Sequence, residues 1–303
     1  MERDSIESDI LDYSEEDNIN EQLDREMIDK VRPDLPKSLY HYCSYKALDG
    51  ILSTGSWWFG SINGTNDMSE TDCLYVKEFI KDKNLIQNLD EESREDIILA
   101  IKRINDDKEL QSRFIVSFSE VKDDEHQWEK YGDNFGGVCI EIDPAFFSKF
   151  DYRANTEEYL TWTKISYDIQ THKHELQKVT DTYIKEDGFG LSNADVLAWD
   201  YIGAALNMKS LEWEKENEWR LVLTTNDELT FRDRYCKRCF TRNGRNYYDF
   251  DLVKKLRDVG IQPIKSITLG SSSKKTIEDT QKLVQHSKFN ITNIFRSQKT
   301  EDE

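Results

Sequence analysis

Hydrophobic positions along the chain follow two different periods, which predicts a mixture of strands and helices. Short blocks rich in β-branched and aromatic residues, often with apolar residues at every second position, are typical of strands. Such blocks cover 39–43, 56–61, 113–120, 137–143, 164–168, 218–224, 266–270 and 290–295. Apolar residues spaced three and four positions apart predict helices over 44–55, 72–112, 126–137, 171–210 and 274–287. Long helical stretches between short strands favour an α+β fold with a mixed, mostly antiparallel sheet and helical insertions.

The two ends of the chain differ in composition from its centre. Residues 1–18 are dense in Asp, Glu and Ser, which predicts disorder, and 20–31 have the apolar spacing of a short amphipathic helix. Pro33 and Pro36 then break the chain. The predicted organisation is an acidic segment over 1–37, one domain over 38–296 and a charged tail over 297–303.

Composition narrows the class of protein. Apolar residues make up 37% of the 303 residues, aromatic residues 12% and charged residues 33%, which indicates an aromatic-rich core within a charged shell. No apolar run approaches the roughly 20 residues of a membrane helix, and the acidic N-terminus lacks the apolar region of a secretory signal. We therefore expect a cytoplasmic protein without a membrane partner. The five cysteines should stay reduced, and the lone Cys236-x-x-Cys239 pair lacks a second ligand pair, so no metal site is predicted.

Charge is distributed unevenly along the chain. The net charge is −19, and residues 1–30 hold twelve acidic residues against three basic ones. Residues 232–245 have the opposite bias, with six basic residues and one acidic residue. Basic residues alternating with aromatic rings suit single-stranded nucleic acid or a nucleotide, so Arg238, Arg242 and Tyr235 are candidate binding residues. The alternative is a solvated loop that pairs with the protein's own acidic surface.

The predicted strand 218–224 carries the most informative polar pair. Strand geometry places Trp219, with the leucines that follow it, on one face, and Glu218 and Arg220 on the other. One interpretation is a salt bridge at a sheet edge. The other is a carboxylate held on a rigid strand above a cleft, which makes Glu218 a candidate catalytic residue.

Four further side chains are candidates for binding or structural roles. His41 lies in the first predicted strand, where a single histidine is more often a structural hydrogen-bonding residue. Ser117 and Ser119 share one strand face and could either bond at a strand edge or grip a ribose or phosphate. Tyr131 precedes Gly132 at the end of a predicted helix, where it is either a core residue or a stacking ring at a cleft.

Signature motifs of several enzyme classes are absent from the sequence. There is no Walker loop, and GxGxxG, GxSxG and HExxH do not occur. The remaining candidates include a histidine, a strand glutamate, paired serines and several aromatics. Such a set suits a reaction in which the protein orients a reactive cofactor and stabilises a cation-like transition state.

Six ordered landmarks resemble those of an uncharacterised bacterial domain family over about 38–296. They are LYHYCSYKALDGILSTGSWWFGSINGTNDMSE, SFSE (117–120), WEKYGD (128–133), GVCIEID (137–143), KSLEWEKENEWRLV (209–222) and SITLG (266–270). The opening also resembles ADP-ribosyltransferases of the DarT and RNA 2′-phosphotransferase type. That resemblance implies an ADP-ribosyltransferase-like core that uses NAD.

The resemblance also implies roles for individual residues. Tyr131 would stack on the nicotinamide. Glu218, with Glu216 in reserve, would orient the ribose 2′-hydroxyl and support an oxocarbenium-like transition state. The implied NAD-binding residues are His41, Tyr42, Ser44, Ser117, Ser119 and Arg220.

The expected activity is NAD-dependent mono-ADP-ribosyl transfer by a toxin or phage-defence effector. The expected acceptor is RNA, another nucleic acid or a protein, and an antitoxin or inhibitor protein is a candidate partner. The alternatives are an NAD glycohydrolase, an enzyme that removes a 2′-phosphate from RNA, and a non-catalytic interaction module. A separate hypothesis is that the acidic N-terminus folds over 232–245 and controls access to it.

Overall fold

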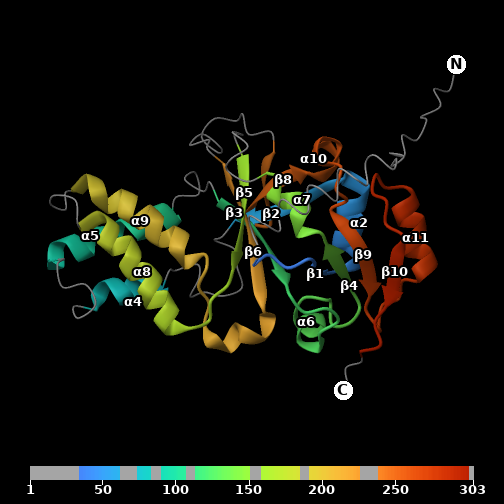
Figure 1. Cartoon of the computed structure of the whole chain (residues 1–303), viewed down its shortest axis with the longest axis horizontal. Helices are drawn as coiled ribbons and strands as arrows, with labels where there is room; N and C mark the ends of the chain where they lie inside the picture. Colours follow the sequence, from blue (N-terminus) through green and yellow to red (C-terminus); the bar gives the residue numbers. More distant parts are fainter. Residues whose placement is uncertain are drawn as a thin grey trace, which may run out of the picture. The chain divides into compact units, whose positions relative to one another are not determined.

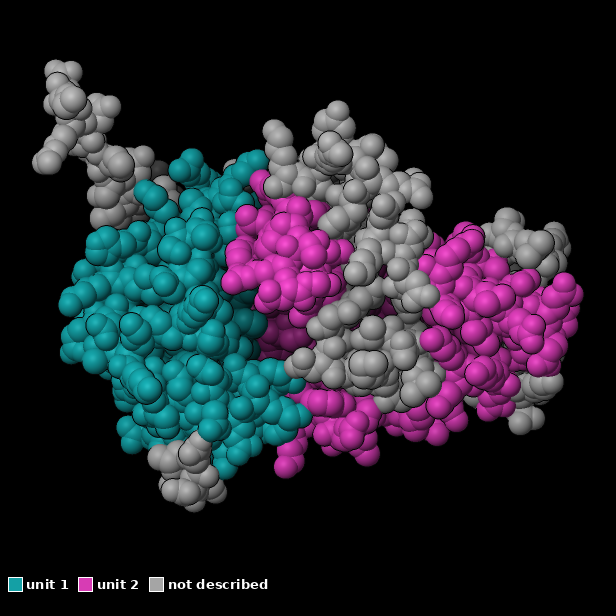
Figure 2. Space-filling model, turned by 180° about the vertical axis from the view of Figure 1, so that it is seen from behind, with its two compact units in different colours: residues 1–57, 122–149, 251–303 teal, residues 58–121, 150–250 magenta. Residues whose placement is uncertain are grey.

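The computed structural model describes residues 34–61, 74–82, 90–106, 113–150, 158–184, 191–225 and 238–299. The chain divides into two compact units, coloured separately in Figure 2. Unit 1 comprises 1–57, 122–149 and 251–303, and unit 2 comprises 58–121 and 150–250. Both units contain strands and helices (Figure 1), which confirms the predicted α+β class.

In the described residues of unit 1, the strands follow the order β10-β9-β4-β1. They are β1 (Leu39–Cys43), β4 (Val138–Ile142), β9 (Ile264–Leu269) and β10 (Asn293–Arg296). The pairs β1–β4 and β4–β9 are antiparallel, whereas β9–β10 is parallel. The helices are α2 (Tyr45–Thr54), α6 (Glu125–Lys130), α7 (Pro144–Ser148), α10 (Leu252–Val259) and α11 (Ile277–Gln285).

The first helix of unit 1 begins and ends where its residues predict. The Ser44 side chain caps α2 by accepting a hydrogen bond from the Ala47 backbone N–H. Gly55 ends the helix in a left-handed conformation with φ of 72°, which glycine adopts without a steric penalty. Leu48, Ile51 and Leu52 share one face of the helix and are buried. The predicted helix over 44–55 is confirmed.

Unit 2 is built around antiparallel strands. Its strands are β3 (Arg113–Ser119), β5 (Glu158–Lys164), β6 (Glu218–Thr225), β7 (Cys239–Arg242), β8 (Arg245–Asp251) and most of β2 (Ser56–Ser61). β6 lies between β3 and β5, and β2 is followed in the sheet by β8 and then β7. The helices are α4 (Leu74–Lys81), α5 (Glu91–Asp106), α8 (Ile169–Ile184), α9 (Leu191–Ala205) and the 3₁₀ helix η4 (Leu211–Glu216).

Four helices of unit 2 share a hydrophobic core of their own. Figure 1 shows α4, α5, α8 and α9 side by side, and their buried apolar residues form one cluster. Ile101 from α5, Leu197 and Tyr201 from α9 are fully buried within it. Within the described residues, the helical prediction for 72–112 is confirmed by α4 and α5, and that for 171–210 by α8 and α9, although 206–210 are not helical.

Two predicted elements differ most from the structure in their boundaries. The helix expected over 126–137 stops at Lys130, because Asp133, Asn134 and Phe135 all adopt positive φ angles that a helix cannot contain. The strand expected over 164–168 lies earlier, over 158–164. Asp168 instead caps α8 by accepting hydrogen bonds from the N–H groups of its first turn.

Some predicted features lie outside the described residues. These are the disorder over 1–18, the helix over 20–31, and the side chains of Tyr235 and Cys236. Within the described part of the chain, no helix is long and apolar enough to cross a membrane. Over the same residues, no group of three or more His, Cys, Asp or Glu side chains is placed to hold a metal ion.

Candidate functional site

The strand that carries Glu218 is a central strand and not an edge strand. β6 pairs with β3 through Ser119 opposite Glu218 and Ser117 opposite Arg220, and it pairs with β5 on its other side. Residues 218–223 are buried on both faces of the strand. The expected salt bridge between Glu218 and Arg220 is present, but its expected position at an exposed sheet edge is wrong, because both residues lie in the interior of unit 2.

The chain segment between α9 and β6 covers the face that carries Glu218. After α9 the backbone turns at Leu206, whose side chain packs against Ile115 and Val222. Ser210 then caps η4, and Asn217 ends it in a left-handed conformation with φ of 43°. This short reversal brings residues 206–216 back over the strand that follows them.

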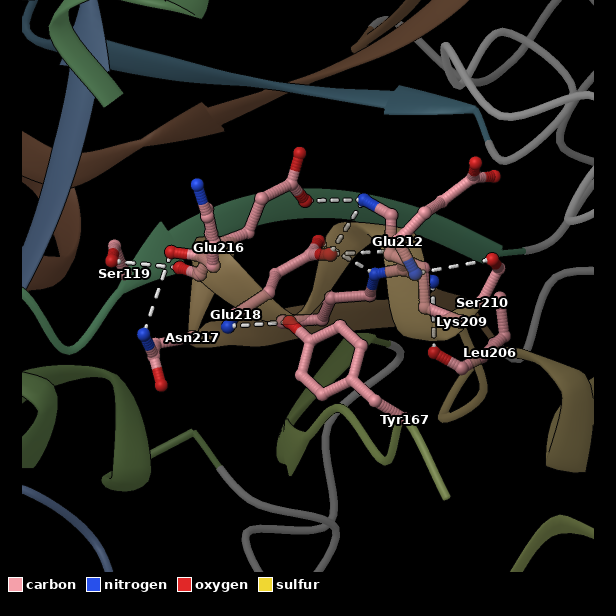
Figure 3. Close-up of polar contacts among 11 residues, drawn as sticks. Ser119, Tyr167, Leu206, Lys209, Ser210, Glu212, Glu216, Asn217 and Glu218 are labelled. Carbon is pink, nitrogen blue, oxygen red and sulfur yellow. Dashed lines mark hydrogen bonds and ion pairs between the residues drawn. The ribbon is translucent and has the colours of Figure 1, made fainter. Parts of the chain in front are cut away.

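Four charged side chains meet here, and we call Lys209, Glu216, Glu218 and Arg220 the charged cluster. Figure 3 labels the first three of them. Arg220 Nε donates to Glu218 Oε1 at 2.8 Å and Nη2 donates to Oε2 at 3.1 Å, which is a bidentate contact. Lys209 Nζ donates to Glu218 Oε2 at 3.1 Å and also pairs with Glu216. Arg220 Nη1 donates to the Leu206 carbonyl oxygen at 2.9 Å.

The charged cluster is almost completely removed from solvent. Its residues are between 1% and 6% exposed, and their formal charges sum to zero. Burial by itself raises the pKa of Glu218, but the positive charges of Arg220 and Lys209 outweigh this effect and lower the pKa to about 2. The Glu218 carboxylate is therefore ionised at neutral pH.

A pocket of about 460 Å³ adjoins the charged cluster within unit 2. Lys209 lines this pocket and also pairs with Glu218. Tyr167 lines it too, and the Tyr167 hydroxyl accepts a hydrogen bond from the Glu218 backbone N–H at 2.9 Å. His172 also lines the pocket, and its Nε2 lies 2.7 Å from the Ser166 carbonyl oxygen. The volume lies within the range of pockets that hold small ligands.

The two predicted strand serines have different environments. Ser117 is exposed, and its side chain hydrogen-bonds to Glu218. Ser119 is buried; its hydroxyl donates to the Glu216 carbonyl oxygen at 2.8 Å and accepts from the Val121 N–H at 3.1 Å. Ser117 is therefore a solvent-exposed partner of the Glu218 carboxylate, whereas Ser119 holds the backbone of the covering segment in place.

The structure places the other predicted NAD-binding residues in unit 1. The His41 ring packs edge-on against Trp57, with ring centroids 5.2 Å apart. Tyr42 is buried against Trp128, and its hydroxyl accepts a hydrogen bond from the Asp124 N–H at 3.1 Å. Ser44 is the cap of α2 described above.

Tyr131 also belongs to unit 1. It follows the last residue of α6 and packs, partly buried, against the cluster that contains Tyr42 and Trp128. The predicted site residues thus form two groups. Glu218, Glu216, Arg220 and the two strand serines are brought together in unit 2, and His41, Tyr42, Ser44 and Tyr131 lie in unit 1.

Of the predicted acceptor-binding residues, Arg238 and Arg242 lie next to or within a β-hairpin formed by β7 and β8, and Tyr235 lies outside the described residues. Arg238 lies partly buried just before β7, and Arg242 is exposed at the end of that strand. Tyr248, one of the aromatics that follow the basic segment, faces inward and packs against Phe114. Only the outward-facing aromatic residues of this hairpin remain available to a ligand.

Lys209 and Tyr167 are functional candidates that sequence reasoning missed. Their positions relative to Glu218 depend on the chain reversal at 206–217 and on the pairing of β5 with β6. Tyr167 lies outside the six landmarks, and Lys209 is the first residue of the landmark KSLEWEKENEWRLV (209–222), in which no role was predicted for that lysine.

One comparison with known proteins gave a match. A family model described as "Protein of unknown function (DUF2971)" matches residues 127–221, which include Tyr131, Tyr167 and the whole charged cluster. No curated protein matches the chain. No solved structure matches it either. The match places the charged cluster within a region that is similar to a family of proteins of unknown function.

Proposed function

We propose that the chain cleaves the nicotinamide–ribose bond of NAD and transfers the ADP-ribosyl group to an acceptor. The observation that carries the proposal is the Glu218 carboxylate, which is held ionised on a central strand and is paired with Lys209, a residue that lines a pocket of about 460 Å³. A fixed negative charge stabilises a positive charge that develops on a sugar ring.

The reaction balances without an oxidant or a metal ion. The C–N bond between nicotinamide and ribose breaks, and its electron pair leaves with neutral nicotinamide. The positive charge remains on the ribose as an oxocarbenium-like ion. A nucleophile of the acceptor, or water, then forms the new bond to the anomeric carbon and releases one proton.

The residues of the charged cluster divide into two roles under this proposal. Glu218 faces the developing positive charge and is the proposed catalytic residue. Arg220 and Lys209 are positioning residues, because they hold both carboxylate oxygens in one orientation. Ser117 contributes an exposed hydroxyl that hydrogen-bonds to Glu218.

The test compares two variants that remove the same charge from the same cluster. Glu218→Gln and Glu216→Gln each leave a buried positive charge, so both should lose stability, by about 3–5 kcal/mol. We expect Glu218→Gln to release nicotinamide roughly a hundredfold more slowly than the wild type. Glu216→Gln should lose much less activity, provided that circular dichroism shows both variants to be folded.

The readout is nicotinamide released from NAD, measured by chromatography after incubation with the full chain. Mass spectrometry of the other product separates transfer from hydrolysis, because hydrolysis yields free ADP-ribose. Incubation with 2′-phosphorylated RNA tests phosphate removal in the same way. Equal loss of activity in Glu216→Gln and Glu218→Gln would mean that the cluster acts only by holding the fold together.

A non-catalytic interaction module is the second candidate function. It is favoured by the fact that both carboxylate oxygens of Glu218 already have cationic partners. A buried, neutral set of four charges can specify a fold without taking part in chemistry. Absence of nicotinamide release by the wild-type chain at micromolar concentration would favour this function over the first.

A further inference from the structure

Three aromatic rings of unit 2 gather on neighbouring strands, and we call Trp58, Phe240 and Tyr247 the aromatic platform. Phe240 and Tyr247 are directly opposite across the β7–β8 hairpin and stack, with centroids 5.5 Å apart and an interplanar angle of 18°. Trp58 on β2 lies edge-on to Phe240 at 4.9 Å and tilted to Tyr247 at 6.1 Å. Residues far apart in sequence therefore form one contiguous surface.

The aromatic platform faces outward from the sheet. Alternate residues of β8 are buried, with Tyr248 and Phe250 in the core, so that Tyr247 points to the opposite face. Trp58 is 39% exposed, which is unusual for a tryptophan with so large an apolar ring. Packing within the protein therefore leaves part of this apolar surface in contact with water.

Two arginines adjoin the aromatic platform, of which Arg242 is exposed and Arg245 is partly buried. Arg242 and Arg245 are directly opposite each other in the hairpin register, an arrangement in which like charges repel. The Arg242 guanidinium lies 5.3 Å from the Trp58 ring centroid, and that of Arg245 lies 5.5 Å from the Tyr247 centroid. Arg245 also donates to the Ser61 carbonyl oxygen at 3.1 Å. Among the described residues, neither guanidinium forms an ion pair with a carboxylate.

We propose that the aromatic platform and its two arginines bind single-stranded nucleic acid. Unpaired bases stack on exposed aromatic rings, and guanidinium groups bind phosphates with bidentate hydrogen bonds. A bound phosphate would also relieve the repulsion between Arg242 and Arg245. An acidic peptide would satisfy the arginines but would leave the three rings without stacking partners, so the nucleic acid fits more of the surface.

The binding experiment uses the full chain without NAD, so its outcome is independent of the proposed enzymatic activity. Fluorescein-labelled 12-nucleotide oligo(U) and oligo(dT) are titrated by fluorescence anisotropy at 50 mM and 200 mM salt. We expect Trp58→Ala to weaken binding about tenfold or more at 50 mM salt, and Trp58→Phe to restore most of the affinity. Arg242→Gln should reduce the slope of log affinity against log salt by about 0.7.

Two control variants match these changes elsewhere on the surface. Phe295→Ala removes another exposed aromatic ring that lies beneath a cation, since Lys122 Nζ is 5.3 Å from its centroid. Arg103→Gln removes an exposed arginine that pairs with Asp195. Neither control should change oligonucleotide affinity more than twofold. Thermal melting of each variant detects any loss of fold.

Three outcomes would overturn the proposal. The first is no binding of either oligonucleotide by the wild type at 50 mM salt. The second is equal affinity for a 12-base-pair duplex, because paired bases do not expose their faces to stacking. The third is binding of a 12-residue polyglutamate that Arg242→Gln weakens and Trp58→Ala does not, which would identify an acidic peptide as the ligand.

Discussion

The pKa of the Glu218 carboxylate is set by two neighbouring positive charges, which outweigh the effect of its burial. Arg220 and Lys209 supply two positive charges, and Glu216 balances the second of them. Breaking such a buried set by removing one member costs far more than breaking an exposed ion pair. A residue held in this way can be catalytic only if a substrate reaches it without displacing those partners.

The lowered pKa of Glu218 predicts a specific dependence of stability on pH. Its folded pKa of about 2 lies below the ordinary value of 4.5, so its contribution is fully present above about pH 4.5. That contribution, of the order of 3 kcal/mol, is lost as the pH falls from about 4.5 towards 2. Urea unfolding of the wild type and of Glu218→Gln across this window measures it.

The difference in unfolding free energy between these two proteins should shrink as the pH falls. Other carboxylates with lowered pKa values, such as Glu120 and Glu141, titrate in both proteins and cancel in the comparison. A difference that stays constant from pH 5 to pH 2.5 would contradict the ionised state assigned to Glu218.

Ser117 and Ser119 provide a matched pair for separating chemistry from folding. Ser117→Ala removes an exposed hydroxyl beside Glu218, so nicotinamide release should fall several-fold while stability changes by less than about 0.5 kcal/mol. Ser119→Ala removes two hydrogen bonds from a buried position and should cost about 1–3 kcal/mol. The reverse pattern of effects would exclude the role given to Ser117.

Single residues of the candidate site could be predicted only in part. Strand alternation correctly placed Glu218 and Arg220 on one face, since that depends on local geometry alone. It could not reveal Lys209, whose contact with Glu218 requires the chain reversal before β6. Nor could strand alternation show that Ser117 is exposed and Ser119 buried, because burial depends on what the covering segment packs against.

Within individual elements, replacing two different glycines by alanine should change the stability of the fold in opposite directions. A Cβ at Gly270 would lie 2.1 Å from the Phe135 carbonyl oxygen, which belongs to a backbone that cannot move aside. Gly270→Ala should therefore cost about 1–3 kcal/mol. Gly50, within α2, has no atom near its Cβ position, and Gly50→Ala should gain about 0.5–1 kcal/mol.

Thermal denaturation of these two glycine variants beside the wild type measures both effects. Equal destabilisation by both substitutions would contradict the close backbone approach at Gly270.

The loop that contains Phe135 also explains why the helix predicted over 126–137 ends early, at Lys130. Phe135 is fully buried with a φ of 61°, a conformation that its residue type gives no reason to expect.

Most helices and strands could be predicted because their apolar spacing is regular. Ser44 and Gly55 defined both ends of α2, and the helices of unit 2 followed from their periodicity. The β7–β8 hairpin was missed because charged residues obscure the alternation that begins at Arg245. The register that places Trp58 beside this hairpin is a tertiary feature and has no counterpart in local sequence.

At the scale of the whole molecule, the charge distribution opposes the nucleic-acid binding proposed for the aromatic platform. The net charge is −19, and residues 1–30 contribute nearly half of it. Deleting these residues should strengthen oligonucleotide binding several-fold at 50 mM salt and much less at 300 mM, because salt screens distant charges. Anisotropy titrations of both proteins measure this change. An affinity that does not change at either salt concentration would mean that the acidic segment has no influence on the binding surface.

Steady-state kinetics of NAD cleavage test the proposal that Glu218 stabilises the transition state. For the folded Glu218→Gln variant, we expect kcat for nicotinamide release to fall roughly a hundredfold or more, with KM for NAD nearly unchanged. Such a pattern is expected of an interaction made only in the transition state. A kcat equal to that of the wild type, or a change confined to KM, would contradict the claim.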